Sequence, residues 1–276
     1  MDIATRRRSL QYFQDLSSKP EEQIELAAAA LEIARPEYPE LDRSWYLNLI
    51  AELASEARAT LPQSGSTTDR ARALLHFLSV ERRFRGNIED YYSPGNSFLH
   101  EVLERHQGLP ITLAVVYLEV GALCGIPLEG VGLPGHFVLR GGDIFIDPFY
   151  GVELTETEVR DRFKEVNGSD VPFNPAFLET VSKRSMLIRI LHNLKHLYIA
   201  QDDVDRALSC CERCLALMPD SAPDLRDRGL IFLSAERFND AITDLERYLA
   251  LTPQDSWAEP VRKRLEEARQ RVAGFH

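Results

Sequence analysis

The chain has 276 residues, of which 44% are hydrophobic and 27% are charged, a composition typical of a globular protein with a sizeable core. The net charge of −11 repels a phosphate backbone unless a basic patch overrides it. The two short basic runs, Arg6 to Arg8 and Arg82 to Arg85, are typical of solvated surface. We therefore exclude a largely disordered chain, expect two compact domains from the length, and expect no nucleic-acid partner.

The cysteines and the N-terminus bear on the cellular compartment. Three of the four cysteines are Cys210, Cys211 and Cys214, which stand at helical intervals without a second thiol pair or ligand-spaced histidines, so they predict no zinc site. No apolar stretch follows Met1. Together these features indicate a reducing compartment without secretion, and we expect a cytoplasmic protein.

One segment has the apolar character of a membrane span. Residues 109–128 carry Glu119 as their only charge, but Gly125-Ile126-Pro127 interrupts them. What remains is a helix of about fourteen residues, which is too short to cross a bilayer. We therefore expect a buried core helix and no membrane association.

The first half of the chain shows helical patterns that give way to a sheet. Ser18-Lys19-Pro20-Glu21 combines a cap candidate, an early proline and a capping-box glutamate, so it predicts the start of a helix that continues to Ala34. From Gly130 onward, short β-rich runs predict a sheet. Between these, apolar residues at helical spacing predict four more helices, over residues 45–57, 71–80, 97–105 and 111–124.

Gly141-Gly142 separates two of the β-rich runs. Paired glycines suit a two-residue type I′ turn because both central residues need a positive φ. In that register Arg140 faces Asp143, and His136 lies directly opposite Asp147. We therefore expect the side chains of His136 and Asp147 to be adjacent, beside the start of the helix at residue 111.

A linker-like passage divides the chain. Residues 166–172 are rich in turn-forming residues, and everything after residue 182 has helical patterning. The sequence therefore predicts a first domain of residues 1–175 and a second of residues 176–276.

The second domain contains an internal repeat. Ala241 follows Ala207 by 34 residues, and Pro253 follows Pro219 at the same interval. The pattern resembles two tetratricopeptide repeats, at about 188–221 and 222–255, followed by a capping helix. Lys195 stands at the usual glycine position of the first repeat.

Ten side chains define the register of the repeats. Small residues let paired helices approach, aromatic residues fill the groove between them, and prolines end each second helix. Because such a module docks another polypeptide, we expect a protein or peptide partner. The ten are Leu191, Tyr198, Ala207, Pro219, Leu225, Gly229, Phe232, Ala241, Tyr248 and Pro253.

Two further patterns are candidates for cofactor or metal binding. Residues 130–135 match the dinucleotide fingerprint G-x-G-x-x-G, but a strand-like run follows them instead of the helix whose N-terminus holds pyrophosphate. His192 and His196 are four residues apart on a predicted helix, but no third ligand accompanies them. We expect no cofactor and no metal site.

The most informative constellation is Gly108-Leu109-Pro110, a helix that ends at Gly125-Ile126-Pro127, and then His136 and Asp147. It resembles the core of transglutaminase-like (papain-like) acyl-transfer enzymes, in which a G-x-C motif starts a helix and a histidine and an aspartate follow on adjacent strands. The resemblance implies an α+β fold, with a helical N-terminal region, a helix-plus-antiparallel-sheet core and then the all-α repeat module. It also puts Pro110 at the nucleophile position, and proline has no nucleophilic side chain.

Residues 15–155 also resemble a narrower group, the bacterial SirB-type proteins, which join a transglutaminase-like domain to tetratricopeptide repeats. That group is associated with regulation of gene expression, so the resemblance implies an architecture rather than a reaction. The blocks that carry it are Tyr38 to Asp42, Phe84 to Asn87, Asp90 to Tyr92, Asn96 to Leu99, Gly108 to Leu113, Pro134 to Phe137 and Asp147 to Phe149.

We therefore expect a non-catalytic, protein-binding or regulatory protein in which His136 and Asp147 are a vestigial dyad. Cys124 cannot replace the missing nucleophile, because it lies at the negative end of the helix dipole. The alternative is a hydrolase or acyl/amide-processing enzyme that uses His136 and Asp147 with water, Thr112 or Ser97 as the nucleophile. A third interpretation is a hydrogen-bonded structural pair within the sheet.

Overall fold

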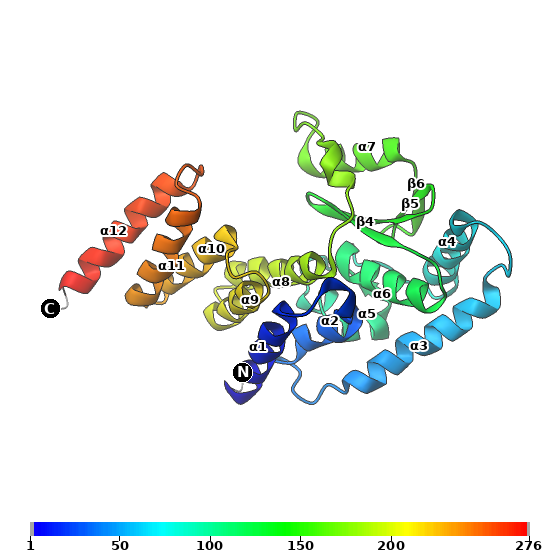
Figure 1. Ribbon diagram of the computed structural model, residues 1–276, viewed down its shortest axis with the longest axis horizontal. Coiled ribbons are helices and arrows are strands. Elements are labelled where there is room, and N and C mark those ends of the chain that lie inside the picture. The colour runs from blue at the N-terminus through cyan, green and yellow to red at the C-terminus, as the bar shows by residue number, and fades with distance from the viewer. Residues whose placement is uncertain (1–2, 275–276) are drawn as a thin grey trace. The chain divides into compact units, whose positions relative to one another are not determined.

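The computed structural model describes residues 3–274, which divide into two compact units. The first unit comprises residues 20–190, and the second comprises residues 3–19 together with residues 191–274. The first combines helices with a small antiparallel sheet, whereas the second is helical (Figure 1). The expected α+β class, with an all-α repeat module at the C-terminal end, is confirmed.

A buried helix, α6 (Pro110–Leu123), forms the core of the first unit. Proline suits its first helical position, and its nearly continuous apolar sequence is that of a helix covered on all sides. The helix stops where Gly125 takes a φ of +68°. The other helices of this unit are η1 (Glu21–Gln23), α2 (Leu26–Ala34), α3 (Arg43–Thr60), α4 (Thr67–His76), η2 (Phe77–Glu81), η3 (Pro94–Asn96), α5 (Leu99–Arg105), α7 (Glu156–Asn167), η4 (Pro175–Leu178) and the first part of α8 (Lys183–Ala200).

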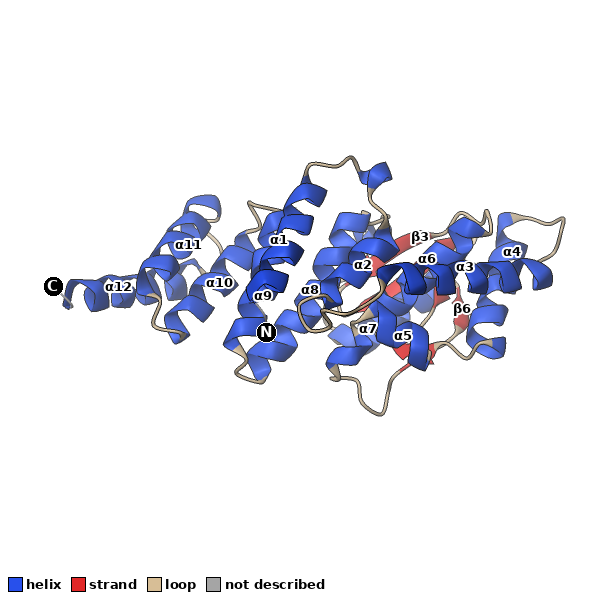
Figure 2. Ribbon diagram, turned by 90° about the horizontal axis from the view of Figure 1, so that it is seen from below, coloured by secondary structure: helices blue, strands red, loops and turns tan. Residues whose placement is uncertain are grey.

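The sheet of the first unit is an antiparallel meander. Its order is β3-β4-β5-β6, and α6 lies against one face while α7 covers the other (Figures 1 and 2). The core under α7 and η4 includes Val131, Val138 and Phe145, which lie on three neighbouring strands and share one face of the sheet because successive side chains alternate between the faces. The strands are β3 (Glu129–Leu133), β4 (His136–Gly141), β5 (Ile144–Asp147) and β6 (Val152–Leu154), and a separate parallel pair joins β1 (Arg85–Gly86) to β2 (Gln107–Gly108).

The predicted register of the β4-β5 hairpin is wrong, because the two-residue turn lies one residue later than predicted. Gly141 pairs with Ile144, so Gly142 and Asp143 are the turn residues and Arg140 faces Phe145 rather than Asp143. Only Gly142 of the two turn residues has a positive φ, of 64°, as a type II′ turn requires at its first central position. Gly141 is a glycine for another reason, because a Cβ there would lie 2.8 Å from the side chain of Ala71.

The single helix predicted from residue 18 to Ala34 is also wrong. The structure has α1 (Ile3–Ser17), the short turn η1 and then α2. Glu21 does not close a capping box with Ser18, because its carboxylate accepts hydrogen bonds from the backbone N–H groups of Lys183 and Arg184. A contact distant in sequence thus replaces the local cap.

The boundary between the units falls later than the residue 175 expected from the linker-like passage. Phe177 and Leu178 pack on the sheet, and the backbone N–H of Val181 donates to Gly130 O at 2.9 Å. These contacts hold the segment after residue 175 in the first unit. In the second unit, α1 packs against α9, where Arg6 and Glu212 form an ion pair at 2.9 Å.

The second unit contains the two expected tetratricopeptide repeats and a capping helix. Ala207 and Ala241 are buried in the paired helices, and a Cβ on Gly229 would lie 2.6 Å from Leu245 Cδ2, so glycine permits the close approach of α10 and α11. Across residues 3–274, no helix has both the length and the apolar character that crossing a membrane requires. The helices are α9 (Val204–Leu217), α10 (Ala222–Ser234), α11 (Phe238–Leu251) and α12 (Ala258–Gly274), which follow the second part of α8.

Candidate functional site

His136 and Asp147 meet at the end of the sheet. His136 is the first residue of β4 and Asp147 is the last of β5, and both side chains are buried on the face that α7 covers. Nε2 of His136 is hydrogen-bonded to Asp147 Oδ2 at 2.8 Å. The two side chains are therefore adjacent, as the sequence predicts, although the observed register makes them diagonal rather than directly opposed neighbours.

The Asp147 carboxylate has partners on both oxygens. Oδ1 accepts hydrogen bonds from the backbone N–H groups of Phe149 at 3.0 Å and Tyr150 at 3.2 Å, while Oδ2 takes His136. The guanidinium of Arg162, on α7, adds an ion pair, with Nε 3.5 Å from Oδ2. Asp147 thus fixes both the turn after β5 and the imidazole, which leaves Nδ1 as the ring nitrogen available to a further group.

Arg162 and Tyr150 belong to this site, and sequence analysis missed both. Arg162 Cζ lies 4.2 Å from the centre of the Tyr150 ring, within the range of a cation–π contact. The ring of Tyr150 lies 6.1 Å from that of His136. Nothing in the sequence distinguishes Arg162 from the other charged residues of α7, because the contact depends on how that helix lies on the sheet.

Pro110 begins α6 with no functional group. Hydrogen bonds link the start of this helix to the strand end that carries Asp147: Gly86 N donates to Phe149 O at 2.7 Å, and Asn87 N donates to Gly108 O at 3.2 Å. The segment that leads into Pro110 is therefore connected through β1 to the residues that follow Asp147. In the resemblance described above, this helix start is where a nucleophilic thiol would stand.

Within the first unit, residues 20–190, no thiol lies near that helix start. Cys124 is fourteen residues along the chain from Pro110, a distance of about 20 Å at the rise of an α-helix. Its Sγ contacts Ala54 O at 3.4 Å, and burial raises the pKa of the thiol. The other three cysteines lie in the repeat unit. Cys124 is therefore structural rather than nucleophilic.

The two hydroxyl groups considered as alternative nucleophiles are both buried. Thr112 lies in the first turn of α6, and its Oγ1 has no hydrogen-bond partner within residues 3–274. Ser97 is buried after η3. No hydrogen bond joins either hydroxyl to His136 in the described structure, so neither shows the contact that would activate it.

Three exposed tyrosines, together with Phe149, form a chain of ring contacts that reaches His136, and we call these tyrosines the aromatic rim. The rim consists of Tyr91, Tyr92 and Tyr150, with Phe149 buried beneath it. The ring of Phe149 lies 5.9 Å from that of Tyr91 and 5.1 Å from that of Tyr150. Tyr92 is 80% exposed and Tyr150 is 48% exposed, so the rim presents large amphipathic surfaces to solvent beside a buried polar pair.

Of the ten register residues of the repeat unit, the two prolines are exposed and the other eight are buried. Lys195, at the usual glycine position, is also buried, and its Nζ donates to Asp224 Oδ1 at 2.8 Å and Asp227 Oδ2 at 2.7 Å. The burial of Lys195 alone would lower its pKa, but the two carboxylates outweigh that effect and raise it. His192 also contacts Asp224, at 2.8 Å, a neighbour that the sequence did not reveal.

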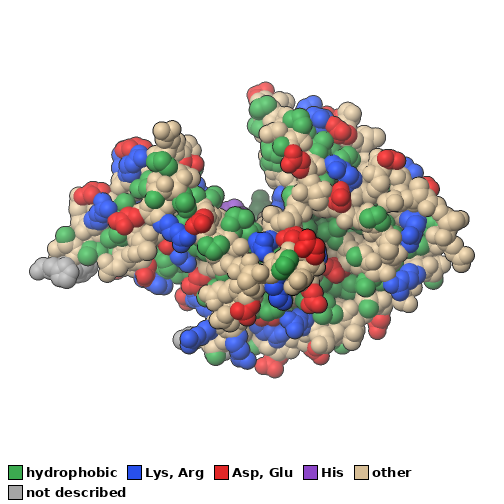
Figure 3. Space-filling model, viewed as in Figure 1, with side chains coloured by type: hydrophobic (Ala, Val, Ile, Leu, Met, Phe, Trp, Pro, Cys, Tyr) green, Lys and Arg blue, Asp and Glu red, His purple; other side chains and the backbone are tan. Residues whose placement is uncertain are grey.

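Two weaker candidates have structural explanations. The glycine-rich residues 130–135 form β3 and the turn into β4, so no helix N-terminus follows them to hold pyrophosphate. Acidic and basic side chains are interspersed on the face of each unit shown in Figure 3. That face presents no continuous basic stripe that would follow a phosphate backbone.

The fold of the first unit is that of a transglutaminase-like protein. Residues 44–192 match the family described as Transglutaminase-like superfamily, and residues 194–266 match the family described as Tetratricopeptide repeat. The chain is 36% identical over 264 residues to a UPF0162 protein of Xylella fastidiosa strain Temecula1, covering 93% of this chain and 94% of the relative. It is 32% identical over 234 residues to UPF0162 protein PA3419 of Pseudomonas aeruginosa, covering 82% and 84% respectively.

A shorter match reaches F-box only protein 21 of Mus musculus, which is 30% identical over 129 residues, 46% of this chain and 19% of the relative. Since the bacterial matches extend over nearly all of both chains, the sequence belongs to the UPF0162 family, within the transglutaminase-like superfamily.

Proposed function

We propose that this chain is a regulatory polypeptide-binding protein, in which the aromatic rim beside a vestigial His136–Asp147 pair recognises one partner segment and the repeats dock another. The observation that carries the proposal is Pro110 at the first position of α6. A proline there removes the nucleophile of the superfamily, while the hydrogen bond between His136 and Asp147 stays intact. The site therefore keeps a recognition surface without the group that would form an acyl intermediate.

The chemistry of the rim supports recognition of a polypeptide. Tyrosine side chains bury a large area at a low entropic cost and are enriched among the residues that dominate protein interfaces. Ile88, which precedes the rim in sequence, is also exposed. A phenol is protonated at neutral pH and can donate a hydrogen bond, and burial, which raises the pKa of Tyr91, acts in the same direction.

The repeat unit supports a second contact. A cavity of about 430 Å³ lies between α8 and α10, and apolar side chains such as Ile199 and Leu230 share its lining with Arg226 and Asp227. Such a mixture suits an extended peptide that has apolar and charged side chains. A relationship to SirB-type proteins and a cytoplasmic location also belong to this proposal, because both rest on the sequence analysis described above.

Site-specific photo-crosslinking tests the rim. A photoreactive phenylalanine analogue at Tyr92 or Tyr150 is expected to capture one and the same polypeptide. The analogue at Trp45, which is 52% exposed on α3, is the matched control and should not capture it. The captured polypeptide, once purified, should bind the parent chain and lose that binding to a Tyr92→Ala/Tyr150→Ala variant. Equal capture from Trp45 would contradict the proposal.

The alternative function is amide processing without a thiol, and the intact hydrogen bond between His136 and Asp147 favours it. The purified protein offered glutamine peptides with an amine, or fluorogenic amides, should show no turnover, and iodoacetamide should change nothing. A pH-dependent amidase activity that disappears in His136→Ala, with the fold retained, would instead establish this alternative.

A further inference from the structure

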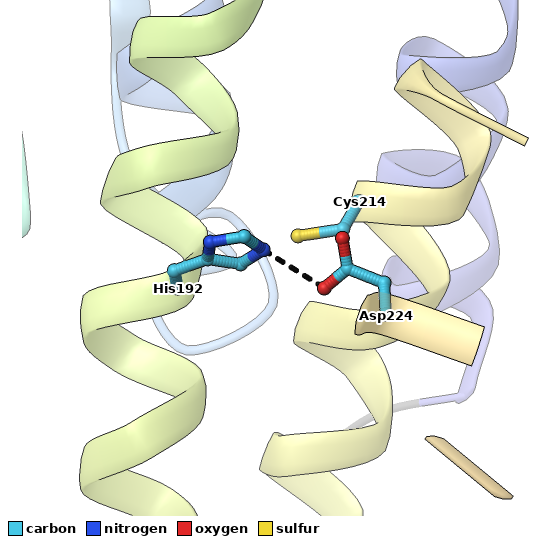
Figure 4. A group of neighbouring side chains, drawn as sticks. All are labelled: His192, Cys214 and Asp224. Carbon is cyan, nitrogen blue, oxygen red and sulfur yellow. Dashed lines mark hydrogen bonds and ion pairs between the residues drawn. The ribbon is translucent and has the colours of Figure 1, made fainter. Parts of the chain in front are cut away.

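Three helices of the repeat unit bring together an imidazole, a thiol and a carboxylate. His192 comes from α8, Cys214 from α9 and Asp224 from α10, and each offers one ligand atom. These three atoms lie within 4.8 Å of one another (Figure 4). We propose that this cluster is a binding site for a divalent transition-metal ion, zinc being the ion that its donors suit best.

The donor types select the class of ion. One sulfur, one nitrogen and one oxygen ligand form a borderline-soft set that suits zinc and excludes calcium and magnesium, which take oxygen ligands. Tetrahedral zinc places its ligand atoms roughly 3.3–3.7 Å apart, at bond lengths of about 2.0–2.3 Å. In this cluster His192 Nε2 lies 2.8 Å from Asp224 Oδ1, and no two of the three ligand atoms are more than 4.8 Å apart, so the side chains have to rotate to surround an ion. Three protein ligands leave one position for water or a fourth group.

The surroundings of the cluster have the features of a built site. Cys214 and Asp224 are fully buried, whereas the His192 side chain keeps 31% of its surface exposed and provides a route of entry. Ser221 Oγ donates to Asp224 Oδ2 at 2.6 Å. Hydrogen bonds of this kind orient metal-binding carboxylates. In Figure 4 the imidazole and the thiol both point toward the carboxylate.

Lys195 is the group that opposes a cation, because its Nζ also contacts Asp224 Oδ1 at 2.8 Å. Asp227 balances that charge through its own contact with Nζ at 2.7 Å. Once the thiol is deprotonated, Cys214, Asp224, Asp227 and Lys195 sum to a net charge of about −2, so a divalent ion brings the cluster to about zero. A metal ion deprotonates a coordinating thiol, which offsets the rise that burial causes in the pKa of Cys214.

Sequence analysis did not predict this site, because its three ligands are far apart in the chain. His192 and His196 lack a third ligand nearby in sequence, and the cysteines lack ligand-spaced histidines. The repeat fold supplies the missing partners by packing the helices together. It also selects Cys214, because Cys210 and Cys211 on the same helix do not belong to the cluster.

Cobalt binding to the full-length chain tests the proposal. After chelator treatment, stoichiometric Co²⁺ is expected to produce a near-ultraviolet sulfur-to-cobalt charge-transfer band, and Zn²⁺ should displace it at one equivalent. Cys214→Ser and His192→Ala should each abolish the band. Cys211→Ser and His196→Ala are the matched controls and should retain it. Ser221→Ala should weaken the affinity by about 10- to 100-fold.

Several outcomes would overturn the assignment. Excess Co²⁺ without the band would do so, as would a band that persists in Cys214→Ser or disappears equally in Cys211→Ser. Because Cys214 is buried, its variant can lose stability, and circular dichroism must show that it is folded. His192→Ala replaces a partly exposed side chain, so it keeps the test decisive if Cys214→Ser fails to fold.

Discussion

The packing of Gly229 against Leu245 gives a prediction in which the sign of one mutation depends on another. Alanine is favoured over glycine in a helix interior by about 1 kcal/mol, so Gly229→Ala taken alone should stabilise α10. The new Cβ would lie 2.6 Å from Leu245 Cδ2 and 2.8 Å from Leu245 Cγ, however, and Leu245 is fully buried. Overpacking of this kind costs about 1–3 kcal/mol. We therefore expect Gly229→Ala to destabilise the repeat unit by about 1 kcal/mol.

Removing the obstructing side chain should reverse that sign. Leu245→Ala alone is expected to cost about 2–5 kcal/mol through the cavity that it creates. In that background Gly229→Ala no longer meets Cδ2 or Cγ, and it should stabilise the protein by up to about 1 kcal/mol. The coupling energy between the two sites is then about 1–3 kcal/mol.

Urea denaturation followed by far-ultraviolet circular dichroism measures this cycle. To identify the transition of the repeat unit, the denaturation is repeated in a Trp45→Phe background and followed by tryptophan fluorescence. Trp257 is then the remaining tryptophan, and it reports on the second unit. The same effect of Gly229→Ala in both backgrounds would refute the argument. Stabilisation of the parent protein by Gly229→Ala, by the full amount of about 1 kcal/mol expected from helix propensity, would also refute it. That result would mean that α10 and α11 do not approach as closely as the structure has them.

Three further predictions concern buried groups. Burial lowers the pKa of His100, so the unfolded chain binds a proton more readily than the folded chain, and the free energy of unfolding should fall as pH drops through about 6.5, by up to about 1.4 kcal/mol per pH unit. The melting temperature of His100→Phe should fall less than that of the parent between pH 7 and pH 5, and an equal fall would contradict this. Asp147→Ala should cost about 3–5 kcal/mol in urea denaturation because it strands buried partners, whereas Glu153→Ala, at the exposed Arg72 ion pair, should cost under about 1 kcal/mol; equal costs would refute the assignment. Ala207→Trp or Ala241→Trp should destabilise the repeat unit by about 1–3 kcal/mol or more and reduce partner binding, and full retention of both would disprove the 34-residue register.

Features set by local sequence were predictable here. The helix at α6 follows from its proline start and its glycine-proline end, and the repeats follow from a 34-residue periodicity in small and aromatic residues. The adjacency of His136 and Asp147 also followed, because moving a two-residue turn by one position shifts the strand pairing by two residues, which keeps each side chain on its predicted face.

Features set by contacts between distant segments were not predictable. The turn at Gly142 depends on Gly141 fitting against Ala71, and the cap at Glu21 is lost to the start of α8. The position of Arg162 beside Asp147 likewise requires knowing how α7 lies on the sheet. In each case a side chain has a second partner far along the chain, and no pattern in a short window records it.

The two carboxylate oxygens of Asp147 have different hydrogen-bond partners, and this affects how genetic data on the protein should be interpreted. One oxygen binds two backbone amides and the other holds His136, so a substitution at Asp147 disturbs the chain path as well as the imidazole. A saturation screen scored by phenotype would return Asp147 among its strongest hits, whether or not the site performs chemistry. Substitutions at His136 are more informative, because they leave the two amide contacts in place. The abundance of each variant in the cell, measured beside its phenotype, separates lost folding from lost function.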